Sequence, residues 1–333
     1  MTDTHHTENQ VAFALWGAGG HARRNVLPAL DTCPATRLIG LTTRDSPVRG
    51  SEADKWQCRS WSEPRYMLED KDLQAIYIAT PTGCHFDHAK QCLTAGLHVL
   101  CEKPLTVDLG QAEYLLTLAR QKNSVLSVAC APVYHRHFTE IMAILRSGRI
   151  GPIRHLTARF GFPHLDPANS RYRADLGGGA YMDFAIYMLY LSEILMASPV
   201  ASASGTIRQE EGFAVDTSGI ARLCFAGDKM ADIQWGYGLE YVNDIRIEGE
   251  SGTVYAAPAF SKPGNIPPFI EVSDPAGNHR YEIEPDIPFV HMLMEFARAG
   301  QDSDLRERLY QRAMRTQVLL DQVRRDCEIT RSG

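Results

Sequence analysis

The stretch HVLCEKPLTVD, residues 98–108, ends an apolar run with an acid, a base and a proline. The ammonium group of Lys103 could donate a hydrogen bond to a reacting oxygen and stabilise the negative charge that develops there. Because the residue before a proline is pushed to extended backbone, Pro104 fixes the direction in which Lys103 projects. A surface lysine is the alternative, but the fixed direction favours catalysis, with Glu102 as the partner that orients Lys103.

A second stretch, GGGAYMDFAIY, residues 177–187, places Asp183 and Tyr187 four residues apart. On a helix this spacing puts two side chains on one face. A tyrosine in an apolar helix usually packs in the core with its hydroxyl satisfied, but the acid one turn earlier favours a role in chemistry. Arg171 and Arg173 precede the glycines and could hold a phosphate or carboxylate of a substrate; solvated loop arginines are the alternative.

A third motif, residues 17–22, has the pattern G-x-G-x-x-A directly after an apolar run. Gly17 allows a tight turn, Gly19 lets a pyrophosphate approach the backbone, and Ala22 permits close packing of helix on strand. The helix that follows would offer free N–H groups to phosphate. We predict a dinucleotide-binding turn here, with a plain strand–helix turn as the alternative.

These motifs lie in a first half that alternates strand and helix. The continuous apolar runs are typical of strands buried on both faces of a parallel sheet, and Asp108 is a candidate helix N-cap. The rhythm predicts a doubly wound α/β domain with right-handed crossovers. The expected strands are residues 11–17, 36–43, 73–80, 97–103 and 124–130, and helices are expected after the glycine turn, over 85–96 and over 108–123.

The end of the second strand should meet the adenosine ribose of the cofactor. NAD sites place Asp or Glu there to accept from the 2′-hydroxyl group. If Thr43 occupies this position, the hydroxyl and the guanidinium of Arg44 suit the 2′-phosphate of NADP; if Asp45 does, NAD is favoured. We expect NADP, with NAD possible and a solvated Arg44 as the alternative.

From about residue 150 the rhythm changes to short alternating runs separated by turn signals, which predicts a largely antiparallel sheet. A helix over 177–196 interrupts these runs, and residues 288–299 and 304–327 are expected to form helices that pack back on the first domain. The fold class is therefore an N-terminal Rossmann doubly wound parallel sheet plus a C-terminal α+β domain with a large, mostly antiparallel sheet. The expected domains are 8–128 for NAD(P) binding and 129–333 for substrate binding and oligomerisation.

Composition limits the remaining classes of function. The net charge of -6 over 333 residues argues against a nucleic-acid binder. Eight scattered cysteines without a C-x-x-C pair indicate reduced thiols. The polar N-terminus is unlike a signal peptide, and no apolar run is long enough to span a bilayer. We expect a cytoplasmic protein.

The motifs occur in the order seen in the glucose–fructose oxidoreductase and inositol dehydrogenase (Gfo/Idh/MocA) family, which the chain resembles over nearly its whole length. The resemblance rests on residues 17–22, IATPTGCHFDHA, HVLCEKPLT and GGGAYMDFAIY. Within the family the chain is most similar to the nucleotide-sugar 3-ketoreductases, on the basis of SRYRADLGGG, Tyr187 and GYGLEYVNDIRIEGESGTVY.

The resemblance implies an NAD(P)-dependent oxidoreductase that moves a hydride between nicotinamide and a carbonyl or hydroxyl carbon of a sugar, with a nucleotide-linked 3-keto sugar as one candidate. A dehydrogenase of a free sugar, aminosugar or cyclitol is one alternative, and a non-catalytic dinucleotide-responsive regulator is another. The implied catalytic residues are Lys103, Asp183 and Tyr187. The expected cofactor contacts are Gly17, Gly19, Gly20, His21, Ala22, Thr43, Arg44, Thr80, Pro81, His85, Glu102 and Lys103, and the expected substrate contacts are Lys103, Tyr134, Arg171, Tyr172, Asp183 and Tyr187.

Two further expectations concern metals and assembly. His135, His137 and His164 could contact a substrate, but we expect loop or surface histidines; they lack a consistent metal-ligand spacing, so we expect no metal. Strands in the second half carry Phe225, Trp235 and Tyr237. Because a large exposed apolar face usually marks an interface, we expect a homodimer or homotetramer joined through this sheet.

Overall fold

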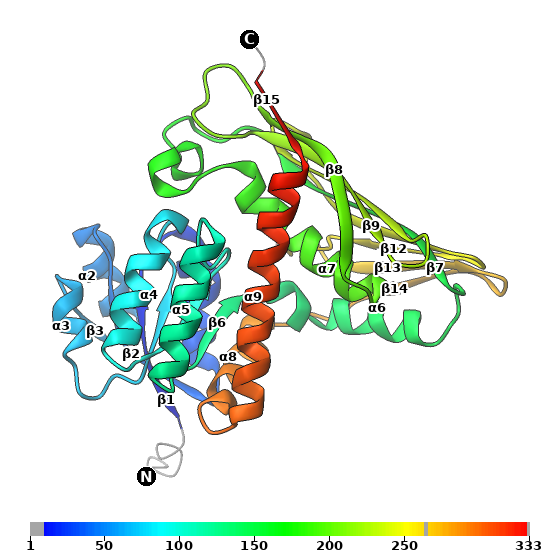
Figure 1. Cartoon of the computed structure of the whole chain (residues 1–333). Coiled ribbons are helices and arrows are strands. Elements are labelled where there is room, and N and C mark those ends of the chain that lie inside the picture. Colours follow the sequence, from blue (N-terminus) through cyan, green and yellow to red (C-terminus); the bar gives the residue numbers. More distant parts are fainter. Residues whose placement is uncertain (1–9, 263–265, 332–333) are drawn as a thin grey trace. The chain divides into compact units, whose positions relative to one another are not determined.

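The computed structural model describes residues 10–262 and 266–331 (Figure 1). The chain divides into two compact units: Met1–Ala131 with Phe289–Gln317, and Pro132–Pro288 with Val318–Gly333. The expectation that the N-terminus is no signal peptide falls on residues 1–9, which lie outside the described part, as do the outermost residues of the two expected domains.

The first unit is built on sheet A, six strands in the order β3-β2-β1-β4-β5-β6, and every pair in it is parallel. This order is that of a dinucleotide-binding Rossmann sheet, so the predicted doubly wound sheet is confirmed. The strands are β1 Val11–Trp16, β2 Thr36–Thr42, β3 Arg59–Ser60, β4 Ala75–Ile78, β5 His98–Glu102 and β6 Leu126–Ala129.

The helices of this unit follow the strands in the expected places. Asp108 caps α5, because its side chain accepts a hydrogen bond from the backbone N–H of Gln111 at 2.9 Å. The segment between β2 and β4, for which the sequence suggested no element, forms two helices around β3. The helices are η1 Ala22–Val26, α1 Leu27–Thr32, α2 Ser46–Lys55, α3 Pro64–Leu68, η2 Thr82–Cys84, α4 His85–Thr94 and α5 Leu109–Gln121.

Two late helices, α8 (Pro288–Ala299) and α9 (Ser303–Asp326), supply part of the first unit's core. The rings of Phe13 and Phe296 lie 5.4 Å apart, and both are buried. Tyr310 and Ala313 belong to the same apolar cluster as the strands of sheet A. The first unit is therefore completed by residues made nearly three hundred positions after its first strand.

The second unit is built on sheet B, nine strands in the order β14-β13-β12-β11-β7-β10-β9-β8-β15. Its pairs are antiparallel except β7 with β10 and β8 with β15, so the predicted mostly antiparallel sheet is confirmed. The strands are β7 Ile153–Phe162, β8 Val200–Gln209, β9 Ser218–Phe225, β10 Met230–Tyr237, β11 Val242–Gly249, β12 Thr253–Ala257, β13 Phe269–Asp274, β14 Gly277–Glu282 and β15 Glu328–Arg331.

Three aromatic residues of sheet B that the sequence singled out, Phe225, Trp235 and Tyr237, lie on its inner face. Trp235 packs on Tyr181 with ring centroids 5.5 Å apart, and Tyr237 packs on Phe184 at 5.2 Å. Phe225, Trp235 and Tyr237 are all buried. The expectation that they form an exposed apolar face was wrong, because strand alternation tells which side chains share a face but not which face the helices cover.

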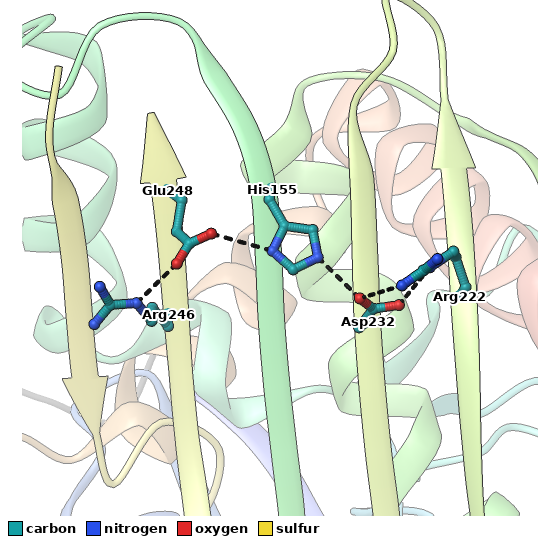
Figure 2. A network of polar contacts seen from close by, with 5 residues as sticks. All are labelled: His155, Arg222, Asp232, Arg246 and Glu248. Atoms are coloured by element: carbon teal, nitrogen blue, oxygen red, sulfur yellow. Dashed lines mark hydrogen bonds and ion pairs between the residues drawn. The ribbon is translucent and has the colours of Figure 1, made fainter. Parts of the chain in front are cut away.

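The outer face of sheet B is instead a row of charged side chains (Figure 2). His155 on β7 lies between two carboxylates, with Nε2 3.0 Å from Asp232 and Nδ1 3.4 Å from Glu248. Asp232 also accepts from Arg222 at 2.7 Å, and Glu248 from Arg246 at 3.0 Å. The pairs of His155 and Arg222 cross between strands, and such pairs of opposite charge stabilise a sheet face, whereas Arg246 and Glu248 lie on the same strand, β11. Together the pairs leave the row nearly neutral.

The remaining helices of the second unit lie between β6 and β8. They are η3 Ala131–Tyr134, which begins at the last residue of the first unit, α6 Arg136–Arg146, η4 Ser170–Tyr172, η5 Ala174–Leu176, η6 Tyr181–Ala185 and α7 Ile186–Met196. The helix expected over 177–196 is thus a π-helical turn followed by an α-helix. None of the helices in the described ranges is long and apolar enough to cross a membrane. All eight cysteines are unpaired thiols.

Candidate active site

The glycine turn follows β1, and its geometry fits a pyrophosphate. Gly17 has φ +101°, and a Cβ there would lie 2.8 Å from the carbonyl carbon and oxygen of Ala79. A side chain at this position would strain the turn and collide with the loop after β4. A Cβ on Gly19 would meet nothing within 4 Å, so open space lies beside its backbone. Ala22 is buried against the sheet, as close helix–strand packing requires.

Glu102 is the last residue of β5, and Lys103 follows it directly. The Glu102 carboxylate accepts from the Tyr77 hydroxyl at 2.7 Å, and its Oε1 lies 3.2 Å from the His21 ring. The backbone N–H of Lys103 lies 3.3 Å from the other carboxylate oxygen. Burial raises the pKa of Glu102, but His21, Tyr77 and Lys103 outweigh it and lower the pKa to about 2. Glu102 is therefore an ionised carboxylate that fixes the start of the Lys103 turn.

The loop after β4 is tied to the same turn. The Thr80 hydroxyl lies 3.0 Å from His88 Nδ1, and the His88 ring stacks on Trp16 with centroids 4.0 Å apart. Burial lowers the pKa of His88 to about 4, so the ring is neutral. Both ring nitrogens of His85 lie against backbone oxygens inside the unit. The expected cofactor contact through the His85 side chain is not available in this structure, whereas Thr80 and Pro81 lie in a partly exposed loop.

The residues after β2 are those that the sequence predicted to contact the adenosine end of the cofactor. β2 ends at Thr42, so Thr43 is the first residue beyond the strand. The Asp45 carboxylate caps α2 by accepting from the N–H of Val48 at 3.0 Å. The guanidinium of Arg44 makes no hydrogen bond or ion pair with another described residue, and Arg44 is exposed. The arrangement leaves Arg44, rather than Asp45, able to contact a ligand.

In the second unit, a glycine turn starts the helix that carries Asp183 and Tyr187. Gly179 has φ +124°, and a Cβ there would collide with the Asp216 carboxylate. Asp216 Oδ2 accepts from the N–H of Tyr181 at 2.6 Å, and burial raises the pKa of Asp216 to about 6. The N-cap residue of this helix, Ala180, makes no side-chain cap, and Asp216 supplies the missing acceptor from a distant segment.

Asp183 lies between two partners on other elements. Arg171 donates from Nε to Asp183 Oδ2 at 2.7 Å, and the Tyr237 hydroxyl lies 3.3 Å from the same oxygen. Asp183 is the main cause of the raised pKa of Arg171. Burial, followed by Asp183, raises the pKa of Tyr237 well above its usual value, so this hydroxyl stays protonated. The sequence prediction named Arg171 and Asp183 separately, and the structure brings them together.

Tyr187 and Asp183 are both half-buried in a segment that is otherwise buried. In the fully described run 179–192, every residue is buried except these two. The Tyr187 ring lies 6.1 Å from that of Phe160, and Phe160 stacks on Phe260 at 5.6 Å. An aromatic wall therefore borders Tyr187 within this unit. A π-helical turn precedes Tyr187, but both polar side chains still leave the helix toward the surface.

Two other expected substrate contacts are placed less favourably. The Tyr172 side chain is buried, and its hydroxyl accepts from the N–H of Leu165 at 3.0 Å, so Tyr172 holds a loop rather than a ligand. Tyr134 is half-buried in η3.

The histidines considered as metal ligands lie apart from one another in role. His137 is fully buried, and His164 lies 3.2 Å from the Tyr172 hydroxyl. No group of three or more possible metal ligands occurs in the ranges that the structure describes.

Several site residues were missed by sequence reasoning. Asp216 and Tyr237 lie 33 and 54 positions from Asp183, and nothing in a single sequence links them. Phe260 has no signal apart from its position after a strand. Tyr77 was recognisable as the one polar-tipped side chain in a buried strand, since a buried tyrosine hydroxyl needs a partner.

The fold and the glycine turn define a class: a dinucleotide-binding oxidoreductase with a second domain built on an open sheet. Comparison with known proteins identifies the family. Residues 11–130 match the model of the oxidoreductase family with an NAD-binding Rossmann fold, and residues 138–255 match the GFO/IDH/MocA C-terminal domain. The chain belongs to the Gfo/Idh/MocA family and is an NAD(P)-dependent oxidoreductase.

Individual relatives are similar over most of the chain. A dTDP-3,4-didehydro-2,6-dideoxy-alpha-D-glucose 3-reductase from Streptomyces violaceoruber is 32% identical over 82% of this chain and 80% of its own. The protein of the same name from Saccharopolyspora spinosa is 32% identical over 76% of each. The crystal structure of KijD10, a 3-ketoreductase from Actinomadura kijaniata in complex with NADP and TDP-benzene, superimposes with a TM-score of 0.92 at 25% identity, covering 98% of this chain and 100% of that chain. The predicted family and fold are confirmed.

Proposed function

We propose that this protein reduces the 3-keto group of a nucleotide-linked sugar with NADPH. The observation that carries the proposal is the fixed Glu102–Lys103 turn at the carboxyl end of β5, where ligands of Rossmann sheets bind. The substrate class is supported by the relatives, which are named as 3-reductases of dTDP-linked deoxysugars.

The glycine turn fits the proposed cofactor. Gly17, Gly19 and Gly20 would bring backbone N–H groups against the pyrophosphate, and Ala22 lets the following helix approach. Thr80 and Pro81 would border the cofactor from the loop after β4. When bound, NADPH supplies the hydride, and the chain's own residues supply binding, orientation and proton transfer.

Lys103 is proposed to act on the oxygen of the carbonyl group that is reduced. Its ammonium would donate a hydrogen bond to this oxygen and stabilise the negative charge that develops as the hydride arrives. Glu102 and Pro104 hold the backbone on either side of it, so little reorganisation is needed when the substrate binds. Glu102 stays ionised at neutral pH and orients the lysine turn without exchanging protons with substrate.

Tyr187 is proposed as the proton donor. It is one of only two half-buried residues in the described run 179–192, and a phenol can protonate an alkoxide. Asp183 and Arg171 form an ion pair at 2.7 Å, and the pair is proposed to bind hydroxyl or phosphate groups of the substrate. The aromatic wall of Phe160 and Phe260 would contact the apolar face of a sugar or a base.

The experiment that tests the function is an assay of NADPH oxidation with a dTDP-linked 3-keto sugar, and of NADP reduction with free sugars and cyclitols. Turnover with the nucleotide-linked keto sugar at least tenfold above that with the free compounds supports the proposal. Preference for a free sugar or cyclitol would contradict the nucleotide-linked substrate and indicate a dehydrogenase of the free compound. Cofactor binding without turnover on any of them would favour a regulatory protein.

We also propose that the protein is a homodimer or homotetramer. The apolar face first expected to support this assembly does not exist as predicted, since Phe225, Trp235 and Tyr237 are buried. Support comes from the outer face itself, on which Ile220 and Met230 are 56% and 39% exposed beside a row of charges that neutralise one another. A nearly neutral face with exposed aliphatic side chains suits a second copy of the same chain.

A further inference from the structure

His85 is a fully buried histidine whose two ring nitrogens both lie against backbone carbonyl oxygens. Nδ1 is 2.8 Å from the oxygen of Pro104, and Nε2 is 2.8 Å from the oxygen of Thr80. The side chain is 1% exposed. Because His85 is the first residue of α4, the ring is anchored in a helix while its partners lie in two loops.

The contact with Pro104 completes the support of the lysine turn. On one side of Lys103, the Glu102 carboxylate is held by Tyr77 and His21. On the other side, the carbonyl group of Pro104 lies against the His85 ring. The backbone on both sides of Lys103 is therefore fixed, one side through Glu102 and the other through His85. The second contact, to Thr80, joins this support to the loop proposed to border the cofactor.

The two contacts also indicate how many protons the His85 ring carries. A neutral imidazole has one N–H donor and one lone pair, and only the protonated ring has two donors. A carbonyl oxygen accepts and never donates. A neutral His85 would therefore place a nitrogen lone pair 2.8 Å from one carbonyl oxygen, which is repulsive. The doubly protonated ring donates to both.

Burial works against this charge. It lowers the pKa of His85, and Lys103 acts in the same direction, whereas the two carbonyl oxygens and the Glu102 carboxylate raise it. His88 is another titratable group that interacts with the ring, and it is neutral. Partners offset the cost of burying a cation, and here each N–H has an acceptor and an ionised Glu102 supplies the counter-charge.

We propose that His85 is a positioning residue that holds Lys103 in place through the Pro104 carbonyl group, and that it does so as the doubly protonated ring. The proposal rests on the role given above to Lys103. It predicts a loss in the chemical step rather than in cofactor affinity, because His85 supports the lysine turn and does not itself contact a ligand.

The kinetic test compares His85→Phe and His85→Gln with His98→Gln. His98 is a matched control because it is a half-buried histidine with a backbone partner. It begins β5, the strand that ends at Glu102, and its Nδ1 accepts from the N–H of Val125 at 3.1 Å. We expect His85→Phe to lower kcat about 10- to 100-fold, the scale of a small misplacement of a reacting group. His85→Gln should recover part of this loss, because its amide can donate to one carbonyl oxygen. The affinity for NADPH, measured by fluorescence, should change less than kcat in both variants.

The spectroscopic test is the ¹⁵N spectrum of the histidine rings in the wild-type protein at pH 7, assigned by its difference from His85→Gln. We expect the His85 signals of a ring with both nitrogens protonated. A singly protonated ring would overturn the charge assignment, and this measurement does not depend on the folding of any phenylalanine variant. Kcat losses in both His85 variants no larger than that in His98→Gln would overturn the positioning role. Full turnover in a Lys103→Met enzyme would instead remove the proposed role of Lys103, while the ring spectrum would still report the charge of His85.

Discussion

At the scale of single residues, Lys103 gives the most direct prediction. Lys103→Met removes the proposed donor to the reacting oxygen, and we expect turnover to fall by about 10²–10⁴-fold, the range for lost acid–base catalysis. Cofactor affinity should be nearly unchanged, because the glycine turn is intact. Stopped-flow oxidation of NADPH measures the first quantity and fluorescence titration the second.

The control for this variant is Lys90→Met, an exposed lysine of α4 in the same unit. It should keep wild-type turnover. A Lys103→Met enzyme that matches Lys90→Met on its true substrate would mean that the lysine turn is only a strand end.

Tyr187→Phe tests the proton donor. Because Lys103 or water can donate in its place, we expect a smaller loss than for Lys103→Met, and a changed dependence of kcat on pH, since the phenol no longer titrates. A pH–rate profile identical to that of the wild-type protein would exclude Tyr187 as the donor. Phe184→Leu, a buried change on the same helix, controls for disturbance of the helix packing.

At the scale of elements, we expect the turn between β2 and α2 to determine the choice of cofactor. The Asp45 carboxylate caps α2, and Arg44 is the residue that we propose to contact a 2′-phosphate. A charge-assisted contact of this kind is worth roughly 1.5–3 kcal/mol, so Arg44→Ala should weaken NADPH binding about 10- to 100-fold and leave NADH binding nearly unchanged. Equal affinities of the wild-type protein for the two cofactors would contradict the prediction.

The start of the helix that carries Asp183 predicts a pH dependence of stability. The pKa of Asp216 is about 6 in the folded protein, against an ordinary value of 3.8 for an aspartate in water, so ionisation disfavours the fold. Its contribution is fully favourable below the unfolded value and is lost as the pH rises through about 6, for a total of about 3 kcal/mol.

Asp216→Asn keeps an acceptor for the Tyr181 N–H without the charge. We therefore expect the stability advantage of the variant over the wild-type protein to be larger at pH 8 than at pH 5. Urea denaturation at both pH values measures the two free energies of unfolding. Asp175→Asn, at an exposed aspartate paired with Arg173, should show no such gain. An Asp216→Asn difference that is the same at both pH values would show that the carboxyl group does not titrate in this range.

The elements also show what a single sequence can and cannot predict. Continuous apolar runs identified the five main strands of sheet A, since a parallel sheet is buried on both faces. Local spacing predicted the glycine turn and the position of Lys103 directly after β5, while the role of Lys103 stays a prediction. The sequence did not predict which face of sheet B the helices cover. The alternation of Phe225 and Trp235 fits a buried face and an exposed face equally well. Asp216 and the Arg171–Asp183 pair depend on contacts between distant segments, which local patterns do not encode.

At the scale of the whole molecule, the outer face of sheet B predicts the assembly. Light scattering should give two or four times 37.1 kDa. Ile220→Lys places a charge on the exposed face and should lower this mass, whereas Tyr66→Lys, at an exposed aromatic residue of the first unit, should not. A monomer at micromolar concentration would contradict the proposal.

The return of α8 and α9 to the first unit has a consequence for synthesis on the ribosome. Residues 132–288 are translated before the segment 289–317 that completes this unit. At about 5–20 residues per second, the nascent Rossmann sheet waits on the order of ten seconds or more for Phe296, Tyr310 and Ala313. During this interval Phe13 and its neighbours lack their final cover. The N-terminal unit, although begun first, therefore completes its core only when nearly the whole chain has been made. A chain released early would present this apolar surface to chaperones and proteases.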